Sequence, residues 1–178
     1  MPRFWRNWRG WIDMVATSEM LSATDNQALD LRHGIAIGDW RLLLPAGQAA
    51  ELVSQPDITP LAYLPVWCLG LCNWHGNVLP VFDWAALLGA TPTVRPYRAL
   101  VLGIAPHFWA LCLKNDPQRL TALQPLPLME VNAPPLLQPY LLGGYGDGQH
   151  TWLDIAYDSL LWHLKTLASL DGLSPATL

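Results

Sequence analysis

The stretch that decides the fold is TPLAYLPVWCLGLCNWHGNVLPVFDWAALLG, residues 59–89. Two apolar runs, residues 66–72 and 78–82, flank His75-Gly76. A small-residue turn between two β-rich runs predicts a hairpin. Asp83 is expected to cap a short helix that Gly89 ends. The stretch therefore predicts a buried hairpin with a polar tip, followed by a short helix.

Three more hairpins are expected on either side of this stretch, because in each a turn segment separates two apolar runs. Their turns are Gly38-Asp39, residues 104–106 and residues 146–149. Residues 91–96 are expected to be a linker that divides two subdomains. The proline-rich residues 120–135 predict an irregular loop. Asp154 is expected to cap a C-terminal helix whose leucines repeat at helical spacing.

Four hairpins, with helices mostly at the ends of the chain, predict a mainly all-β fold. We expect two small β-barrel subdomains that share one core, since small barrels leave no long exposed edges. Short helices are expected at the N-terminus, after the central hairpin and at the C-terminus. The predicted organisation is an N-terminal helix and linker (1–32), a folded domain (33–166) and a C-terminal tail (167–178).

The N-terminal segment shows a helical stripe of apolar residues with arginines opposite it. The stripe consists of Phe4, Trp8, Trp11, Ile12 and Val15, and the opposite face carries Arg3, Arg6, Arg9 and Asp13. One interpretation is a helix that anchors at a membrane surface or binds a partner. The other is a helix that docks on its own domain with its arginines in solvent.

Composition excludes several classes of protein. Of 178 residues, 52% are hydrophobic and 13% are charged, but no apolar run reaches the roughly 18–20 residues of a membrane span. The N-terminus has no secretory signal pattern. A net charge of −4 gives no basic footprint for nucleic acid. Cys68 and Cys72 should share one face of a strand, too far apart to bond, which predicts reduced thiols and a cytoplasmic location.

The sequence contains no nucleophile, phosphate-loop or zinc-protease motif, so we expect neither an enzyme nor a cofactor. His75 and Asp83 could act as a base and its orienting acid. We expect instead a turn histidine and a helix cap, because no nucleophile is spaced to meet them. The ten tryptophans also fit a β-domain that binds a carbohydrate or a peptide. However, Trp67, Trp109 and Trp162 stand in apolar runs and are expected in the core.

Residues 66–89 resemble the signature of CheW-like domains, the adaptors of bacterial chemosensory arrays. The matching positions are Gly70, Asn73, Gly76, Pro80, Val81, Asp83 and Gly89. The resemblance extends over roughly residues 33–166. Within the family, residues 67–84 and 139–155 look most like the PilI-type branch, which serves type IV pilus twitching motility.

The resemblance implies two five-stranded barrels around a shared core and no enzymatic activity. It implies an adaptor that couples a methyl-accepting receptor to a CheA-type histidine kinase. Such an adaptor is cytoplasmic and meets the membrane through receptor arrays, or here through the N-terminal helix. The receptor's helical tip is expected between the barrels and the kinase's regulatory domain at a barrel end.

The resemblance also assigns roles to individual residues. Contacts with partners are expected at Asn73, His75, Gly76, Ile35, Ile37 and Leu71, and structural roles at Gly70, Pro80, Asp83 and Gly89. One position departs from the family pattern, which has Arg where this chain has His75. Histidine is shorter than arginine and cannot form a bidentate contact with a carboxylate. Coupling to the receptor is therefore expected to differ from that of the family, or the partner to carry a different counter-group.

Overall fold

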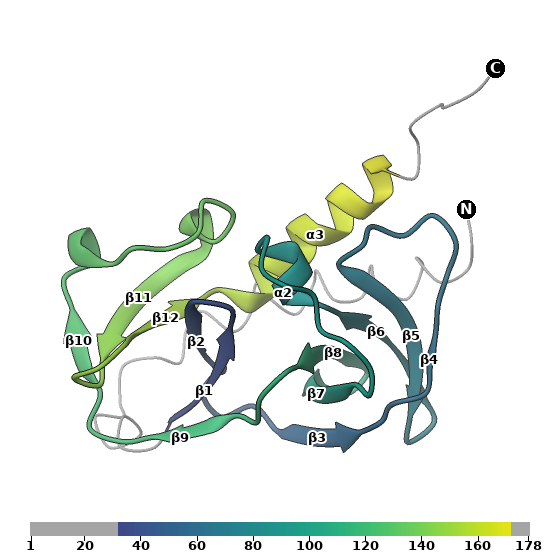
Figure 1. Cartoon of the computed structure of the whole chain (residues 1–178), viewed down its shortest axis with the longest axis horizontal. Helices are drawn as coiled ribbons and strands as arrows, with labels where there is room; N and C mark the ends of the chain where they lie inside the picture. Colours follow the sequence, from purple (N-terminus) through teal and green to yellow (C-terminus); the bar gives the residue numbers. More distant parts are fainter. Residues whose placement is uncertain (1–31, 172–178) are drawn as a thin grey trace.

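The computed structural model describes residues 32–171, whose strands form two six-stranded sheets (Figure 1). Sheet A has the order β10-β11-β12-β2-β1-β9. Its strands are β1 (Arg32–Ile37), β2 (Trp40–Leu43), β9 (Gln118–Leu120), β10 (Gln124–Leu126), β11 (Leu141–Gly146) and β12 (Thr151–Ile155). Sheet B has the order β3-β7-β8-β6-β5-β4. Its strands are β3 (Ala50–Ser54), β4 (Ile58–Thr59), β5 (Cys68–Trp74), β6 (Asn77–Phe82), β7 (Arg98–Ile104) and β8 (His107–Leu113).

Helices are few and short apart from the last one. They are α2 (Trp84–Leu87), the 3-10 turns η5 (Leu128–Glu130) and η6 (Gln138–Tyr140), and α3 (Tyr157–Asp171). The predicted N-terminal helix lies outside the described residues. Among the described residues, no helix is long and apolar enough to span a bilayer. The mainly β fold with helices after the central hairpin and at the C-terminal side is therefore confirmed.

All four predicted hairpins are present, as the antiparallel pairs β1–β2, β5–β6, β7–β8 and β11–β12. Both sheets curl into barrel-like units, but each has six strands and not five. The additional strands are short: β4 has two residues, and β9 and β10 have three each. Elements of that length carry no periodic pattern by which a sequence could reveal them. Strand β10, which contains Pro125, therefore lies within the segment predicted to be irregular.

Residues 91–96 do not divide the two units, contrary to expectation. The strands on both sides of this segment belong to sheet B, where β6 and β8 pair in parallel with Val81 opposite Ala110. The chain between these two strands passes through α2, the following loop and β7, which runs antiparallel to β8. The chain instead begins sheet A with β1–β2, completes sheet B with β3–β8 and then returns to sheet A (Figure 1).

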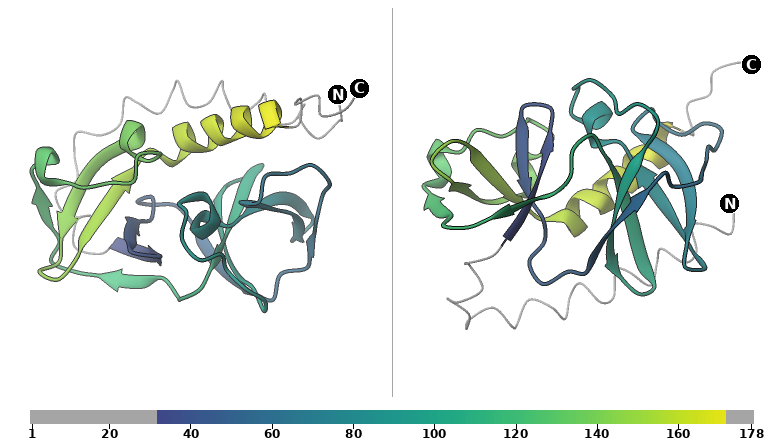
Figure 2. Two further views of the ribbon diagram at one scale, coloured as in Figure 1. Left: turned by 45° about the horizontal axis from the view of Figure 1, so that its top comes forward. Right: turned by 60° about the horizontal axis from the view of Figure 1, so that its bottom comes forward.

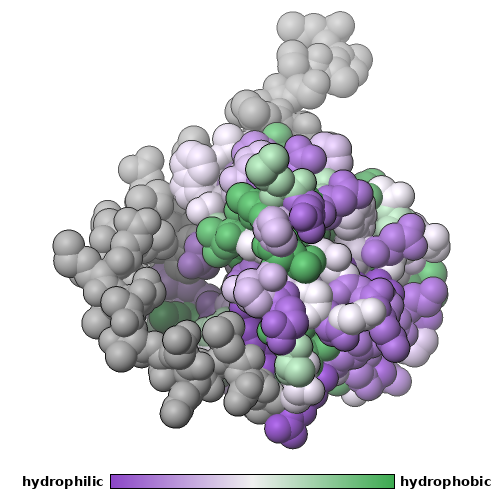
Figure 3. Space-filling view, turned by 90° about the vertical axis from the view of Figure 1, so that its left-hand side faces the viewer, coloured by the Kyte–Doolittle hydropathy of each residue, from purple (hydrophilic) through white to green (hydrophobic). Residues whose placement is uncertain are grey.

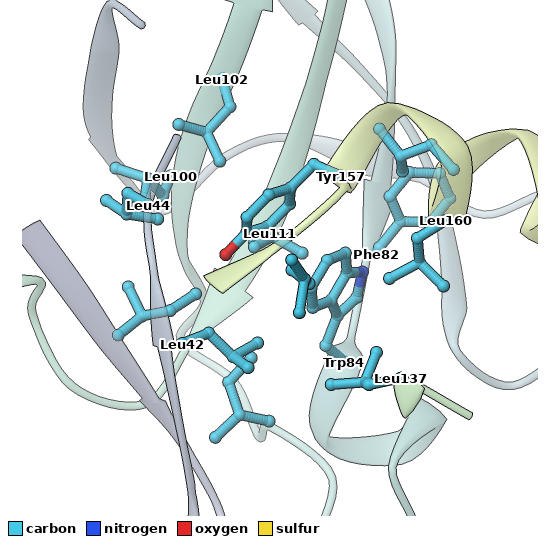
Figure 4. Close-up of a cluster of buried hydrophobic side chains, with 14 of the residues drawn as sticks. Leu42, Leu44, Phe82, Trp84, Leu100, Leu102, Leu111, Leu137, Tyr157 and Leu160 are labelled. Atoms are coloured by element: carbon cyan, nitrogen blue, oxygen red, sulfur yellow. The ribbon is translucent and has the colours of Figure 1, made fainter. Parts of the chain in front are cut away.

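The two sheets share one hydrophobic core, as predicted. It contains Ile35 and Leu42 from sheet A, and Leu100 and Leu111 from sheet B. Trp84 and Tyr157 lie side by side in it (Figure 4) and stack with ring centroids 5.5 Å apart. Trp84 also stacks on Trp109, with centroids 5.9 Å apart. Helix α3, which leaves β12 and runs along sheet B (Figure 2), covers this core with Leu160, Leu161 and Leu164.

Asp154 does not cap the C-terminal helix, because it lies inside β12 and α3 begins three residues later. Its carboxylate instead receives hydrogen bonds of 2.9 and 3.3 Å from the guanidinium of Arg32. Arg32 also donates to the carbonyl oxygen of Leu44 at 3.1 Å and lies 5.8 Å from the ring centroid of Tyr145. This buried arginine connects β1, β11 and β12 across sheet A.

The prediction that Cys68 and Cys72 share a face is wrong. The β5–β6 register shifts between Cys68 and Gly70, and such a bulge changes the alternation of side chains along a strand. Cys68 therefore packs against the shared core, whereas Cys72 lies with Cys112 in the interior of sheet B. All three thiols are free.

Candidate protein-interaction surface

The tip of the β5–β6 hairpin is a two-residue turn with both residues in the left-handed region. The φ angles are +48° at His75 and +81° at Gly76, which is the pattern of a type I′ hairpin turn. The side-chain oxygen of Asn73 accepts a hydrogen bond of 3.0 Å from the amide of Gly76. Asn73, His75 and Gly76 are all exposed, so the structure brings these three predicted contact residues together at one accessible edge.

Glu51, on the end strand β3, contacts this tip although β3 pairs only with β7 in sheet B. Its Oε1 accepts a hydrogen bond of 3.1 Å from Nε1 of Trp74. The same oxygen lies 3.5 Å from Nε2 of His75. The Trp74 ring also packs edge-on against Phe108, with centroids 4.9 Å apart. The imidazole therefore occupies a defined position beside a carboxylate, although its side chain stays 68% exposed.

Sequence reasoning missed Glu51 and Trp74. The signal was weak but present: Glu51 is the one charged residue of β3, and Trp74 directly precedes the turn. What the sequence did not show is that β3 approaches the tip. That proximity comes from the arrangement of sheet B, in which β3 and β4 are the two end strands and are joined by only a short turn.

Asp83 holds the base of the hairpin in place. Its side chain accepts hydrogen bonds from the amides of Ala85 and Ala86, which confirms the predicted helix cap. It also accepts bonds of 2.8 and 3.2 Å from the amide and hydroxyl of Thr93. Asp83 is 1% exposed and lies at the opposite end of β6 from His75, so the interpretation of these two residues as a base and its orienting acid is wrong.

The remaining three motif residues also have identifiable structural roles. Gly70 has φ +133°, and an added Cβ would lie 2.1 Å from the carbonyl oxygen of Thr59. Pro80 is buried opposite Leu71, one residue before the β6–β8 ladder begins, where its missing N–H costs little. Gly89 has φ +72° directly after the last turn of α2, which is the usual helix-ending position of glycine.

Two predicted contact residues are corrected by the structure. Ile35 and Ile37 are 0% and 5% exposed and pack in the shared core, so they offer no side-chain surface to a partner. Alternation along β1 directs both side chains inward because they are two residues apart. Leu71 is half-buried in β5 and pairs with Pro80.

The tryptophans do not form an exposed platform in the described part of the chain. Trp84, Trp109 and Trp152 are buried, whereas Trp40, Trp67 and Trp74 are half-buried. Trp162 is 50% exposed on the outer side of α3, so its predicted place in the core is wrong. A carbohydrate-binding surface usually needs exposed rings side by side, and this distribution does not favour that function.

The cysteines are not placed for nucleophilic chemistry. Burial raises the pKa of Cys112 to about 12, with smaller contributions from Asp83 and Cys72. Burial likewise raises the pKa of Cys68 and of Cys72. The three groups therefore stay as thiols near neutral pH. Among residues 32–171, no group of three or more His, Cys, Asp or Glu side chains has the arrangement of a metal site.

Exposed apolar side chains occur at both ends of the molecule. Figure 3 faces the end formed by sheet A and shows apolar side chains gathered within a largely polar face. Leu128 and Met129 in η5 and Leu142 in β11 are 55%, 100% and 67% exposed. At the other end, the connection from β4 to β5 exposes Leu61, Tyr63 and Val66. Such surfaces are typical of proteins that bind other proteins.

Comparisons with known proteins agree with this geometry. Residues 34–120 match the family model of the CheW-like domain. Protein PilI of Pseudomonas aeruginosa is 27% identical over 137 residues, which cover 73% of this chain and 74% of PilI. Chemotaxis protein CheW of Rhizobium meliloti is 36% identical over 62 residues, which cover 33% of this chain and 40% of that protein.

The fold has a counterpart among solved structures. The crystal structure of the scaffolding protein TtCheW from Thermoanaerobacter tengcongensis superposes with a TM-score of 0.56 at 16% identity. The superposition covers 71% of this chain and 88% of TtCheW. The match over residues 34–120 confirms the predicted resemblance to CheW-like domains, and the superposition confirms the two-unit fold. The similarity to PilI agrees with the predicted branch.

Proposed function

The chain contains a CheW-like domain, and from this premise we propose that it is a non-catalytic cytoplasmic adaptor of a chemosensory array. In this role it couples a methyl-accepting receptor to a CheA-type histidine kinase. The similarity to protein PilI supports an array that controls type IV pilus twitching motility. Through the receptors, the adaptor is associated with the membrane without spanning it.

The observation that carries the proposal is the exposed tip of the β5–β6 hairpin. His75 and Glu51 are 68% and 52% exposed, and their side chains lie 3.5 Å apart at the edge of sheet B. Asp83 and Gly70 fix the base of the hairpin, and the bonds from Trp74 to Glu51 and from Gly76 to Asn73 fix its tip. A rigid scaffold that displays a small polar contact suits a protein that joins two others.

A binding measurement tests the proposal as a whole. Isothermal titration calorimetry of the full-length chain with its cognate CheA-type kinase should show saturable binding. If the two proteins give no heat of binding and do not co-elute in size-exclusion chromatography at micromolar concentrations, the adaptor function is contradicted.

The His75→Ala substitution should weaken receptor-dependent control of the kinase. The free energy of unfolding should fall by less than about 1 kcal/mol, because exposed charge pairs contribute little to stability. Kinase activity in reconstituted receptor arrays and thermal unfolding are the two measurements. Val78→Ala serves as a control, since Val78 pairs with Asn73 beside the same tip, is 62% exposed and has no polar side-chain atom that could bond to Glu51.

His75→Arg provides the reciprocal experiment. Arginine can hold Glu51 in a bidentate pair, which histidine cannot, so this variant should bring kinase control closer to that of family members with arginine. A large loss of stability in His75→Ala, with kinase control unchanged relative to Val78→Ala, would instead make His75 a structural turn residue.

A further inference from the structure

The loop between β4 and β5, residues 60–67, forms a second exposed feature of sheet B. In Figure 1 it rises at the upper right, whereas the β5–β6 tip lies at the bottom. Its side chains Leu61, Tyr63 and Val66 are 42%, 92% and 82% exposed. Because β5 has seven residues, roughly 20 Å separates this loop from the tip. The two surfaces can therefore act separately.

Tyr63 has an unusual backbone conformation. Its φ is +63°, a region that glycine and asparagine accept readily but that costs other residues about 1 kcal/mol. Among the described residues, no hydrogen bond or ring contact involves the Tyr63 side chain, and the residue is 92% exposed. The fold gains nothing from an aromatic ring there. A strained residue that is not explained by packing points to a contact outside the chain.

The chemistry of that contact follows from the surrounding sequence. No Asp, Glu, Lys or Arg occurs between Asp57 and Asp83, so the loop offers only apolar and neutral groups. A lipid surface does not fit, since interfacial binding to anionic lipids draws on Lys or Arg beside the apolar residues. The matching surface must itself be uncharged and apolar, because burying an unpaired charge against these side chains would be costly.

The apolar area and the projecting shape of the loop indicate what kind of partner binds it. Three exposed side chains supply at most about 300–400 Å² of apolar area, against roughly 800 Å² per partner in a stable complex. The loop therefore cannot hold a second copy of this chain by itself, but it can anchor a larger interface. A projecting loop also cannot cradle a receptor helix, which needs a groove. It requires a concave site on a globular domain.

We propose that Tyr63, flanked by Leu61 and Val66, is an aromatic anchor that inserts into an uncharged apolar pocket on the kinase. This inference rests on the proposed function, which supplies the kinase as partner. Tyrosine suits the role because it buries a large rigid area at low entropic cost, and such residues carry much of the energy of protein interfaces.

The test compares the full-length chain with Tyr63→Asn, which removes the ring and tolerates the same backbone conformation. Calorimetric affinity for the kinase should fall roughly 10–50-fold, and the factor should be the same at about 50 and 500 mM salt, because no charge is involved. The melting temperature should stay equal or rise. Val94→Asn, which removes a 76% exposed apolar side chain from the loop between α2 and β7, should bind with wild-type affinity.

Each outcome decides between the proposals. If the wild-type chain does not bind the kinase, the proposed function fails and the anchor fails with it. If the wild type binds and Tyr63→Asn binds equally well, the anchor alone is overturned. An equal loss of affinity in Val94→Asn, or a lower melting temperature in Tyr63→Asn, would also overturn it. So would a wild-type dimer in light scattering that Tyr63→Asn abolishes, since the occupant would then be a second copy.

Discussion

At the residue scale, Gly70 shows how tightly the family motif is tied to backbone geometry. Its φ of +133° and the approach of the Thr59 carbonyl oxygen to within 2.1 Å of a hypothetical Cβ leave no space for a side chain. The obstructing atoms belong to the backbone of residues 59 and 60 and cannot move aside as a flexible side chain can. The glycine thus allows β4 to pair with β5.

The Gly70→Ala substitution should therefore destabilise the chain by about 3 kcal/mol or more, since it adds both a steric overlap and an unfavourable φ. Gly89→Ala is the matched control. It has a positive φ of +72° but no atom within 4 Å of the added carbon, so its cost should be about 1 kcal/mol. Urea denaturation measures both, and equal losses would show that close packing at Gly70 is unimportant.

At the scale of an element, the β11–β12 turn is organised by Asp147. Its carboxylate accepts hydrogen bonds of 2.8 and 2.7 Å from the amides of Gln149 and His150, and one of 2.7 Å from the indole of Trp152. Partial burial alone would raise the pKa of Asp147. The bonds from Trp152, His150 and Gln149, with the nearby His150 charge, outweigh it and lower the pKa to about 2.

A group with a lowered pKa stabilises the fold above its unfolded pKa, near 4, and loses that effect as the pH falls toward 2. Asp147→Asn should therefore be less stable than the wild type by about 1–2 kcal/mol at pH 7, and the difference should shrink between pH 4 and 2. Asp57→Asn, at an exposed turn position, should parallel the wild type. Urea denaturation across this pH range checks both, and a constant difference for Asp147→Asn would contradict the assignment.

At the scale of the whole molecule, the two sheets are expected to unfold together. Trp84 is fully buried against both Tyr157 and Trp109, and the hydroxyl of Tyr157 donates a 2.7 Å hydrogen bond to the carbonyl oxygen of Leu43 in sheet A. Side chains from sheet A, sheet B and α3 thus form one packed cluster. Unfolding of either sheet would expose the side chains that the other sheet contributes to this cluster.

Trp84→Phe should lower the free energy of unfolding by about 2–4 kcal/mol, because it leaves a cavity in this shared core. Unfolding should remain a single transition, with tryptophan fluorescence and far-UV circular dichroism giving the same midpoint. Val78→Ala, at a site 62% exposed, should behave like the wild type. Two separate transitions in the wild type would show that the sheets are independent folding units.

The sequence determined the local elements and the motif by itself. The hairpin around His75-Gly76, the Asp83 cap and the end of α2 at Gly89 depend on residues close together in the chain. Turn chemistry and side-chain alternation act over a few residues, so a sequence pattern is sufficient to predict them. The family resemblance rests on the same local features.

Only the tertiary structure decided what lies beside these elements. It assigned β7 and β8 to sheet B, paired Asp154 with Arg32 and brought Glu51 to the hairpin tip. It also buried Ile35 and exposed Trp162. These outcomes depend on which distant strands pair and on a bulge or a crossover that shifts a face, and no nearby residues encode them. The mainly β fold and the motif were thus predictable from the sequence, whereas the surroundings of the candidate interaction surface depend on long-range packing.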